Sequence, residues 1–194
     1  MALIRSICVF CGSYDRAARS HRSAAARFGR QIASEGIELI FGGGRVGLMG
    51  VLADAAIDAG GRVVGIIPEH LIRAEVGHGK VTELIVTGTM HERKATMFAR
   101  AEAFVVLPGG PGTLDETFEI LTWRQLGLHD KPVVVCDLGG YWTPLTLLID
   151  HMIRRRYVRP DFRSFFSVVS KAEDILPELA RLPAARRPTR ADRV

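Results

Sequence analysis

Short apolar runs rich in β-branched residues alternate along the chain with longer segments of helical periodicity, and this alternation restricts the possible folds most strongly. Parallel strands need long crossover connections, and strands covered on both faces are apolar throughout. The pattern therefore predicts an α/β protein with a doubly wound parallel sheet and helices on both faces. We expect strands at 6–10, 38–41, 63–67, 82–86, 103–107, 132–136 and 166–169, helices at 22–34, 48–59, 91–101, 113–126, 143–155 and 172–182, and a loop at 69–79.

The length and composition are those of an ordinary folded domain. The 194 residues are 47% hydrophobic and 24% charged, and we expect one nucleotide-binding catalytic domain over 1–182. The remaining stretch, 183–194, contains four arginines among proline and alanine, which predicts a basic, disordered tail. Because the tail has no aromatic residue for stacking on bases, the net charge of +5 does not indicate a nucleic-acid partner.

The three cysteines do not indicate a disulfide framework or a metal centre. Cys8 and Cys11 have no second pair to complete a zinc site. No apolar run reaches the roughly 18–20 residues that cross a bilayer, and residues 1–5 lead into a strand without a signal-peptide core. We therefore expect a cytoplasmic protein without a metal or a membrane partner.

Small residues follow several of the predicted strands. They occur at 10–13, 41–44, 88–90 and 107–110. Ligands of open parallel sheets bind beyond the carboxyl ends of the strands, near the point where the strand order reverses. Glycines there let the backbone approach a ligand closely, so Gly12, Ser13, Gly43 and Gly44 are candidate phosphate or ribose contacts.

The sharpest motif is the Gly-rich stretch at 108–116, which links a predicted strand to a predicted helix. Amides at a helix N-terminus after such a turn favour a bound phosphate. Thr113 adds a hydroxyl, either as a helix cap or as a phosphate donor. A Gly-rich turn without any ligand is the alternative for the motif taken alone.

Glu116 favours a ligand site over a turn without a ligand. A carboxylate in the first turn of a helix has a stabilising role available, yet it would repel a phosphate bound beside it. Its position therefore indicates a reacting centre that gains positive charge, such as a sugar carbon. Glu119, at i+3, is expected on about the same face, and Asp115 is expected to point elsewhere.

The second Gly-rich turn, at 42–50, does not fit a dehydrogenase or a P-loop kinase. Its glycines are mis-spaced for G-x-G-x-x-G, and no acidic residue ends the next strand to hold a ribose. It also lacks G-x-x-x-x-G-K-[ST].

Arg93 and Lys94 stand at the start of a predicted helix, where cations oppose the helix dipole. A bound anion would compensate them, and arginine grips oxyanions through two parallel hydrogen bonds. The alternative is a solvated pair of surface cations. His91, beside them, is expected to be a capping or surface histidine.

Together these segments resemble the LOG (LONELY GUY) family of cytokinin-activating phosphoribohydrolases, whose signature P-G-G-x-G-T-x-x-E matches 108–116. The resemblance spans about 4–182 and includes the glycine triplet and the M-x-x-R-K segment at 90–94. It implies a Rossmann-like homodimer that hydrolyses N6-modified AMP, or AMP itself, to the free base and ribose 5-phosphate without a metal or a cofactor.

Carried over by position, the catalytic pair of the family falls on Arg93 and Glu116. Pro111 occupies the variable position of the signature. The substrate-binding positions are Glu75, Arg93, Lys94, Gly110, Pro111, Gly112, Thr113, Leu114, Asp115, Glu116 and Thr122.

Two other functions compete with this one. A nucleotide- or phospho-ligand-binding protein of the same fold would keep the loop without hydrolysis, and the carboxylate of Glu116 argues against it. A lysine decarboxylase needs a lysine that forms a Schiff base with pyridoxal phosphate. Lys94 is the one plausible candidate, and it stands beside an arginine in an apparent phosphate site.

Overall fold

A computed structural model describes residues 4–72 and 77–183 of the chain. Its sheet has the order β4-β3-β2-β1-β5-β6-β7, and every neighbouring pair is parallel. The strands are β1 (Ser6–Phe10), β2 (Glu38–Phe41), β3 (Val63–Pro68), β4 (Glu83–Thr87), β5 (Ala103–Val106), β6 (Val133–Cys136) and β7 (Ser167–Val169). The helices are α1 (Arg19–Ser34), α2 (Gly47–Asp58), α3 (Glu69–Ile72), α4 (Met90–Arg100), α5 (Pro111–Gln125), α6 (Thr143–Arg154) and α7 (Ile175–Arg181), with 3₁₀ turns η1 (Leu138–Gly140), η2 (Pro160–Phe165) and η3 (Ala172–Asp174).

The predicted doubly wound parallel sheet is confirmed, and each predicted strand and helix is present within a few residues. The predicted loop at 69–79 is wrong at its start, because the first four residues form α3. The predicted helix at 172–182 begins instead as the 3₁₀ turn η3. Residues 73–76 and the predicted tail from 184 onward lie outside the described part of the chain.

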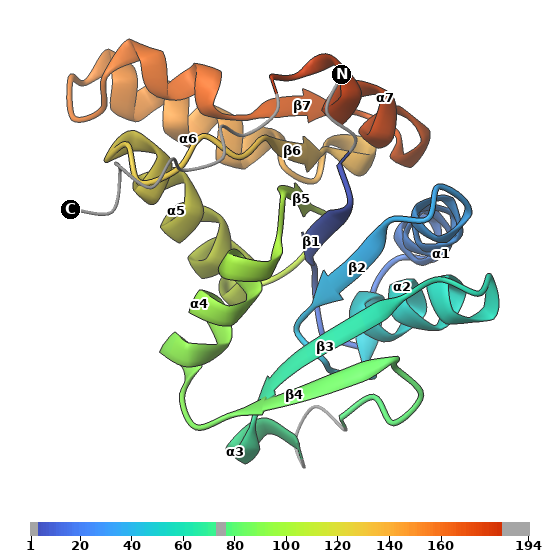
Figure 1. The fold of residues 1–194 in the computed structure, drawn as a ribbon. Helices are drawn as coiled ribbons and strands as arrows, with labels where there is room; N and C mark the ends of the chain where they lie inside the picture. The colour runs from blue at the N-terminus through green and yellow to red at the C-terminus, as the bar shows by residue number, and fades with distance from the viewer. Residues whose placement is uncertain (1–3, 73–76, 184–194) are drawn as a thin grey trace.

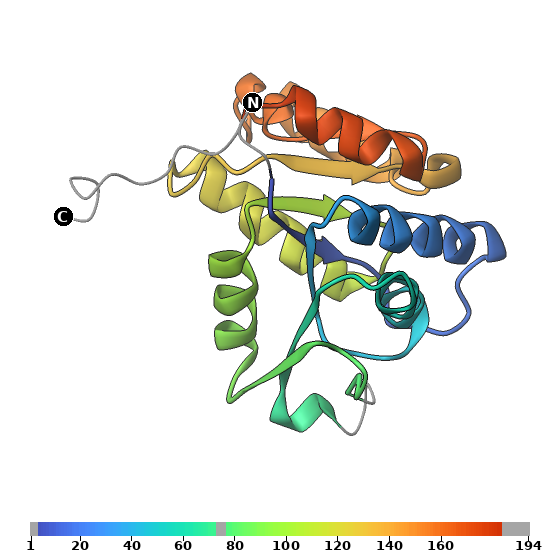
Figure 2. The ribbon, with the colours of Figure 1, turned by 45° about the vertical axis from the view of Figure 1, so that its right-hand side comes forward.

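Two apolar layers form because successive residues of a strand point to opposite faces. Along β1, Ile7 and Val9 pack against α1, α2 and α7, whereas Cys8 and Phe10 pack against α4, α5 and α6. Figures 1 and 2 show these two groups of helices on either side of the twisted sheet. The central strands are therefore buried on both faces, as their continuous apolar sequences predict.

The strand order reverses beside β1, and this reversal creates the site. The chain first adds β2, β3 and β4 on one side of β1, then returns to add β5, β6 and β7 on the other. The loops after β1 and β5 consequently meet: the amide of Gly12 donates to the carbonyl of Pro108 at 3.0 Å. Ligands of such sheets bind in the crevice that opens at this point.

No helix within 4–72 and 77–183 is long and apolar enough to cross a membrane.

Helices α1 and α2 pack closely against one another at Gly29. A Cβ added to this buried helical residue would overlap the carbonyl oxygen of Leu52 and lie 3.2 Å from the amide nitrogen of Ala56. Neither of these backbone atoms can move away without disturbing α2. The glycine is therefore required by interhelical packing and not by its own backbone conformation.

We predict that Gly29→Ala destabilises the protein by about 1–3 kcal/mol, although alanine is the better helix former, because the added methyl overpacks a rigid backbone contact. Urea unfolding followed by circular dichroism measures the change. Gly112→Ala is the matched control, since Gly112 is also helical but has no atom within 4 Å of an added Cβ. Equal stability of the two variants would contradict the packing argument.

Candidate functional site

The loop after β1 is fixed against the start of α2. The amide of Leu48 donates to the carbonyl of Gly12 at 2.9 Å. Gly47 has φ +70°, and a Cβ there would lie 2.6 Å from the carbonyl carbon of Ser13. A residue without a side chain therefore lets the loop containing Gly12 and Ser13 lie directly on the helix.

The N-terminus of α5 is open to solvent. Gly110 is the N-cap residue, Pro111 opens the 15-residue helix, and no atom lies within 4 Å of a Cβ built on Gly110 or Gly112. The first amides of a helix have no intrahelical acceptors and carry the positive end of its dipole. These exposed residues can therefore bind an anion, as the sequence predicts.

Thr113 does not cap the helix, which was one of its two predicted roles. Gly110 occupies the N-cap position, and no side chain makes the cap hydrogen bond. Thr113 is buried, and a Cβ on Gly109 would overlap its hydroxyl, so the side chain packs against the Gly109 backbone. Its capping role is wrong, and the hydroxyl instead shapes the strand-to-helix turn.

Glu116 and Arg93 are both close enough to β1 to act on the buried thiol of Cys8. Burial raises the pKa of Cys8 well above its usual value, the charge of Glu116 raises it further, and the charge of Arg93 lowers it. Burial and the charge of Glu116 also raise the pKa of the Cys11 thiol. The charges of Glu116 and Arg93 are thus both within electrostatic range of β1.

Arg93 is a buried cation that holds backbone. It is 4% exposed, and its guanidinium donates to the carbonyls of Ile66 at 3.1 Å and Gly42 at 2.7 Å. A Cβ on Gly42 would overlap this guanidinium, so the first glycine of the triplet makes room for the arginine. Protein carbonyls therefore accept from part of the guanidinium, and binding of an anion by Arg93 stays a prediction.

Lys94 is compensated by α5. Its ammonium contacts Asp115 at 3.0 Å and Glu119 at 3.1 Å. Partial burial lowers the pKa of Lys94, but hydrogen bonds to the two carboxylates and their charges outweigh burial, and the pKa is raised. Two expectations are corrected: Lys94 needs no bound anion, and Asp115 does not point away from Glu119.

The start of α4 resolves the apparent conflict between its cations and the helix dipole. Thr89 and Glu92 form a reciprocal capping box, in which each side chain accepts from the other residue's backbone amide. A carboxylate in the first turn offsets the unfavourable cations. His91 is exposed, as expected.

The other predicted site residues are distributed around this edge. Leu114 is half-buried against the α4–α6 side of the sheet, and Thr122 is exposed about three turns along α5. Gly43 and Gly44 are buried: Gly43 has φ +74° with Ile66 and Ile67 behind it, and Gly44 pairs with Gly77. Chain packing therefore accounts for these two glycines without a ligand. Glu75 lies outside the described residues.

The sequence analysis missed Tyr141. It follows η1, beyond the carboxyl end of β6, and its hydroxyl donates to the carbonyl of Gly109 at 2.6 Å. Its signal was a pair of glycines and an aromatic residue after a predicted strand, which is the same kind of signal that marked the other loops.

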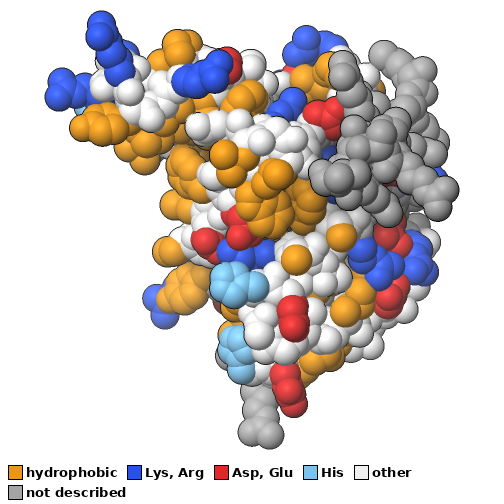
Figure 3. All heavy atoms as spheres, turned by 60° about the vertical axis from the view of Figure 1, so that its left-hand side comes forward, with side chains coloured by type: hydrophobic (Ala, Val, Ile, Leu, Met, Phe, Trp, Pro, Cys, Tyr) orange, Lys and Arg blue, Asp and Glu red, His pale blue; other side chains and the backbone are white. Residues whose placement is uncertain are grey.

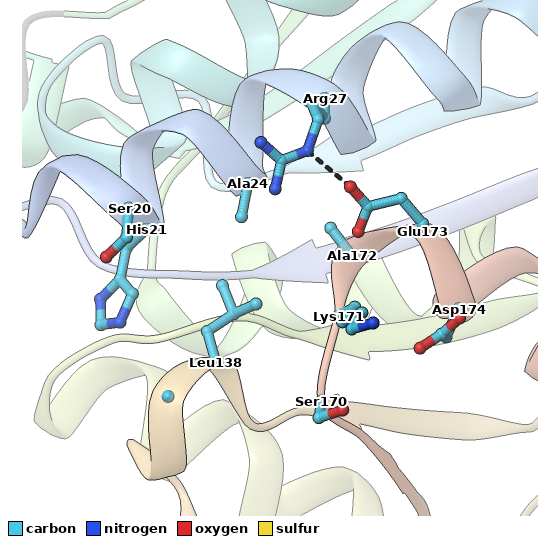
Figure 4. Close-up of a pocket in the computed structure, with 11 residues that line it drawn as sticks. Ser20, His21, Ala24, Arg27, Leu138, Ser170, Lys171, Ala172, Glu173 and Asp174 are labelled. Carbon is cyan, nitrogen blue, oxygen red and sulfur yellow. Dashed lines mark ion pairs between the residues drawn. The ribbon is translucent and has the colours of Figure 1, made fainter.

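A cavity of about 630 Å³ lies beside this tyrosine, at the carboxyl ends of β6 and β7. Figure 4 shows that His21 and Arg27 come from α1, Leu138 from η1 and Lys171 from the segment after β7. Arg27 is paired to Glu173 at 2.7 Å. Cations and carboxylates are mixed in its lining, so it offers no concentrated charge for a phosphate. The lining residues are Ser20, His21, Ala24, Arg27, Leu138, Gly139, Ser170, Lys171, Ala172, Glu173 and Asp174.

Comparison with known proteins decides the family. The chain is 42% identical over 180 residues to "Probable cytokinin riboside 5'-monophosphate phosphoribohydrolase LOGL9" of Oryza sativa subsp. japonica, with 89% of this chain and 79% of that protein covered. It is 40% identical over 175 residues to cytokinin riboside 5'-monophosphate phosphoribohydrolase LOG3 of Arabidopsis thaliana, covering 90% and 81%. The chain belongs to the LOG family.

Solved structures agree on the fold of this LOG-family chain. The molybdenum cofactor carrier protein from Chlamydomonas reinhardtii superposes with a TM-score of 0.72 at 22% identity, covering 92% of this chain and 98% of that one. The molybdenum cofactor binding protein from Rippkaea orientalis gives a TM-score of 0.70 at 23% identity, covering 93% and 98%. At these identities the similarity shows a shared Rossmann-like fold alone.

A family model described as "Possible lysine decarboxylase" also matches residues 49–179. Pyridoxal phosphate chemistry needs a lysine whose amine can lose its proton and attack a carbonyl. Lys94 is instead held as an ammonium by two carboxylates. The residues at this edge do not fit that cofactor, so the description does not match the chemistry of the site.

Within the described ranges, no three histidine, cysteine, aspartate or glutamate side chains are grouped so that they could hold a metal ion.

We predict that Lys94→Gln destabilises the protein by about 1–2 kcal/mol near pH 8, because it removes a charge-assisted bridge between α4 and α5. The pKa of Lys94 is raised on folding, so this contribution is complete below the unfolded pKa of 10.5 and is lost as pH rises through the folded pKa. Urea unfolding at pH 8 and above pH 11 measures both values. The difference between wild type and variant should shrink at high pH, whereas a difference independent of pH would contradict the ion pairs.

Proposed function

We propose that this LOG-family protein hydrolyses the N-glycosidic bond of adenosine 5'-monophosphate or its N6-modified forms, releasing the free base and ribose 5-phosphate. The observation that carries the proposal is the position of Glu116 on α5, about one turn beyond the helix N-terminus, where Gly110 and Gly112 are exposed. A phosphate bound at those amides leaves its ribose within reach of the carboxylate. The relatives named as phosphoribohydrolases support the same reaction.

Glu116 stabilises the reacting sugar. Cleavage passes through an oxocarbenium-like state, and a nearby carboxylate lowers its free energy electrostatically. The oxygen of water bonds to C1′, the bond from C1′ to the base nitrogen breaks, and its electron pair leaves with the base. Glu116 accepts the proton of the attacking water, the departing base takes up a proton from solvent, and Glu116 then returns its proton to solvent.

Arg93 fixes the geometry of this reaction. Its guanidinium is anchored on the carbonyls of Gly42 and Ile66, and its charge acts on the same thiol as that of Glu116. In this proposal the anchored guanidinium orients the Glu116 carboxylate or assists the departing base. Arg93→Ala therefore combines loss of turnover with loss of backbone support.

The substrate's phosphate supplies binding energy away from the reacting bond. The phosphate is held at the N-terminus of α5 by Gly110, Gly112 and Thr113. The neighbouring loop contains Gly12 and Ser13. Such remote binding energy positions the ribose carbon and raises the rate of the chemical step. Further substrate contacts are assigned to Glu75, Lys94, Pro111, Leu114, Asp115 and Thr122, and no metal or cofactor takes part.

The protein acts as a cytoplasmic homodimer in this proposal. Leu126 and Leu128, after α5, and Leu147 and Leu148, on α6, are each more than half exposed. Figure 3 shows hydrophobic side chains gathered on the face that includes α4 and α5. Exposed apolar patches of this kind mark protein interfaces. Sedimentation equilibrium tests the assembly, and a monomer at micromolar concentration contradicts it.

We predict that Glu116→Gln lowers turnover of AMP by at least about 100-fold while leaving the fold intact, because the amide keeps the shape but removes the charge. Chromatography of released adenine measures the rate, and circular dichroism checks folding. Glu178→Gln, on α7 in the opposite layer, is the matched control and should retain wild-type turnover. Wild-type turnover by Glu116→Gln would remove the carboxylate from the mechanism, and nucleotide binding without base release by the wild type would indicate a binding protein.

We predict that adenosine, which lacks the phosphate, is cleaved with a kcat/KM at least about 100-fold lower than AMP, since the helix N-terminus then contributes no positioning energy. The comparison uses the same wild-type enzyme and the same adenine assay. Equal kcat/KM values for the two substrates would contradict a catalytic role for the Gly-rich loop.

A further inference from the structure

We propose that Tyr141 is a positioning residue for the phosphate site: its hydroxyl fixes the peptide between Gly109 and Gly110 and so aims the amide of Gly110 at the phosphate. The hydroxyl donates to the carbonyl oxygen of Gly109 at 2.6 Å. This inference rests on the proposed function, because it assigns a purpose to a contact beside the proposed phosphate site.

The peptide bond between Gly109 and Gly110 is planar, and this planarity couples its two polar groups. The carbonyl of Gly109 and the N–H of Gly110 belong to one rigid trans unit and point in opposite directions. Fixing the carbonyl therefore fixes the direction of the N–H. A hydrogen bond to the carbonyl also polarises the peptide and strengthens the donor on its other side.

Gly110 needs such support because little else packs on it. It is exposed, and no atom lies within 4 Å of a Cβ built on it. Glycine also has the widest conformational freedom of any residue. Gly109, in contrast, is confined by the side chain of Thr113 on one side and lies 3.3 Å from a Cβ built on Gly12. A bond from Tyr141 to the Gly109 carbonyl extends that rigid support to the first exposed amide.

The preceding turn directs Tyr141 back over the loop. Gly139 and Gly140 have φ of +62° and +80°, a conformation that favours glycine at both positions. The carboxylate of Asp137 accepts from the amide of Trp142 and from the hydroxyl of Thr143, which closes the turn at the start of α6. The backbone before and after Tyr141 thus sets the direction in which its side chain points.

Two aromatic side chains contact the ring of Tyr141. It makes perpendicular contacts with Trp142, at 4.9 Å between centroids, and with His21 of α1, at 5.6 Å. Perpendicular aromatic contacts at these distances are favourable. Tyr141 is nevertheless 43% exposed, so water can replace its hydroxyl at the Gly109 carbonyl. Loss of the hydroxyl should therefore affect loop direction more than stability.

The test compares Tyr141→Phe, which removes one oxygen, with Tyr157→Phe, a control at a tyrosine that is 86% exposed. The dissociation constant of inorganic phosphate, from ³¹P NMR titration, and the KM for AMP should each rise about three- to tenfold in Tyr141→Phe, as loss of one hydrogen bond implies. The kcat/KM for adenosine and the urea midpoint should stay at the wild-type values. Tyr157→Phe should match the wild type throughout.

Unchanged phosphate affinity and KM in Tyr141→Phe would overturn the assignment. Equal losses with AMP and adenosine, or a lowered urea midpoint, would also overturn it, because they indicate a general structural role. A wild-type protein that releases no base from AMP contradicts the proposed function, and the two phosphate dissociation constants then still decide the role of Tyr141.

Discussion

The arrangement of this site depends on the buried guanidinium of Arg93. The guanidinium, carried on α4, donates to the carbonyl of Gly42, which follows β2, and to the carbonyl of Ile66, in β3. Gly42 has no side chain, which leaves room for the guanidinium. A buried charge is costly unless hydrogen bonds surround it, so the ends of these two strands and α4 must keep their relative positions. Removing the guanidinium leaves those carbonyls without their donors. If Arg93 acts in the proposed reaction, its substitution changes catalytic geometry and local stability together.

The reversal of strand order determines where the candidate site lies relative to Arg93. Because β1 and β5 are neighbours, the loop at Gly12 contacts the loop at Pro108, and α5 begins where the sheet opens. The amides of α5 then face solvent while Glu116, one turn later, lies near β1. In the proposed function the donors for the phosphate and the carboxylate for the sugar cation come from a single helix, and helix geometry fixes their separation.

The sequence predicted the fold closely because the signals were local. Apolar strands and glycines at their ends have short-range causes, and β1, β2 and most of α5 lie where the pattern placed them. The partners of the charged residues were not predictable in this way. Lys94 meets Asp115 and Glu119, and Arg93 meets Gly42 and Ile66, across separations of about 20 to 50 residues that only the packing of α4 reveals. Tyr141 was missed for the same reason.

The most direct measurement is a crystal structure of the Glu116→Gln variant with AMP, in which the substrate remains uncleaved. We expect phosphate oxygens about 3 Å from the amides of Gly110, Gly112 and Thr113, with C1′ of the ribose facing residue 116. A nucleotide whose phosphate lies elsewhere, for example in the cavity between His21 and Lys171, would contradict it.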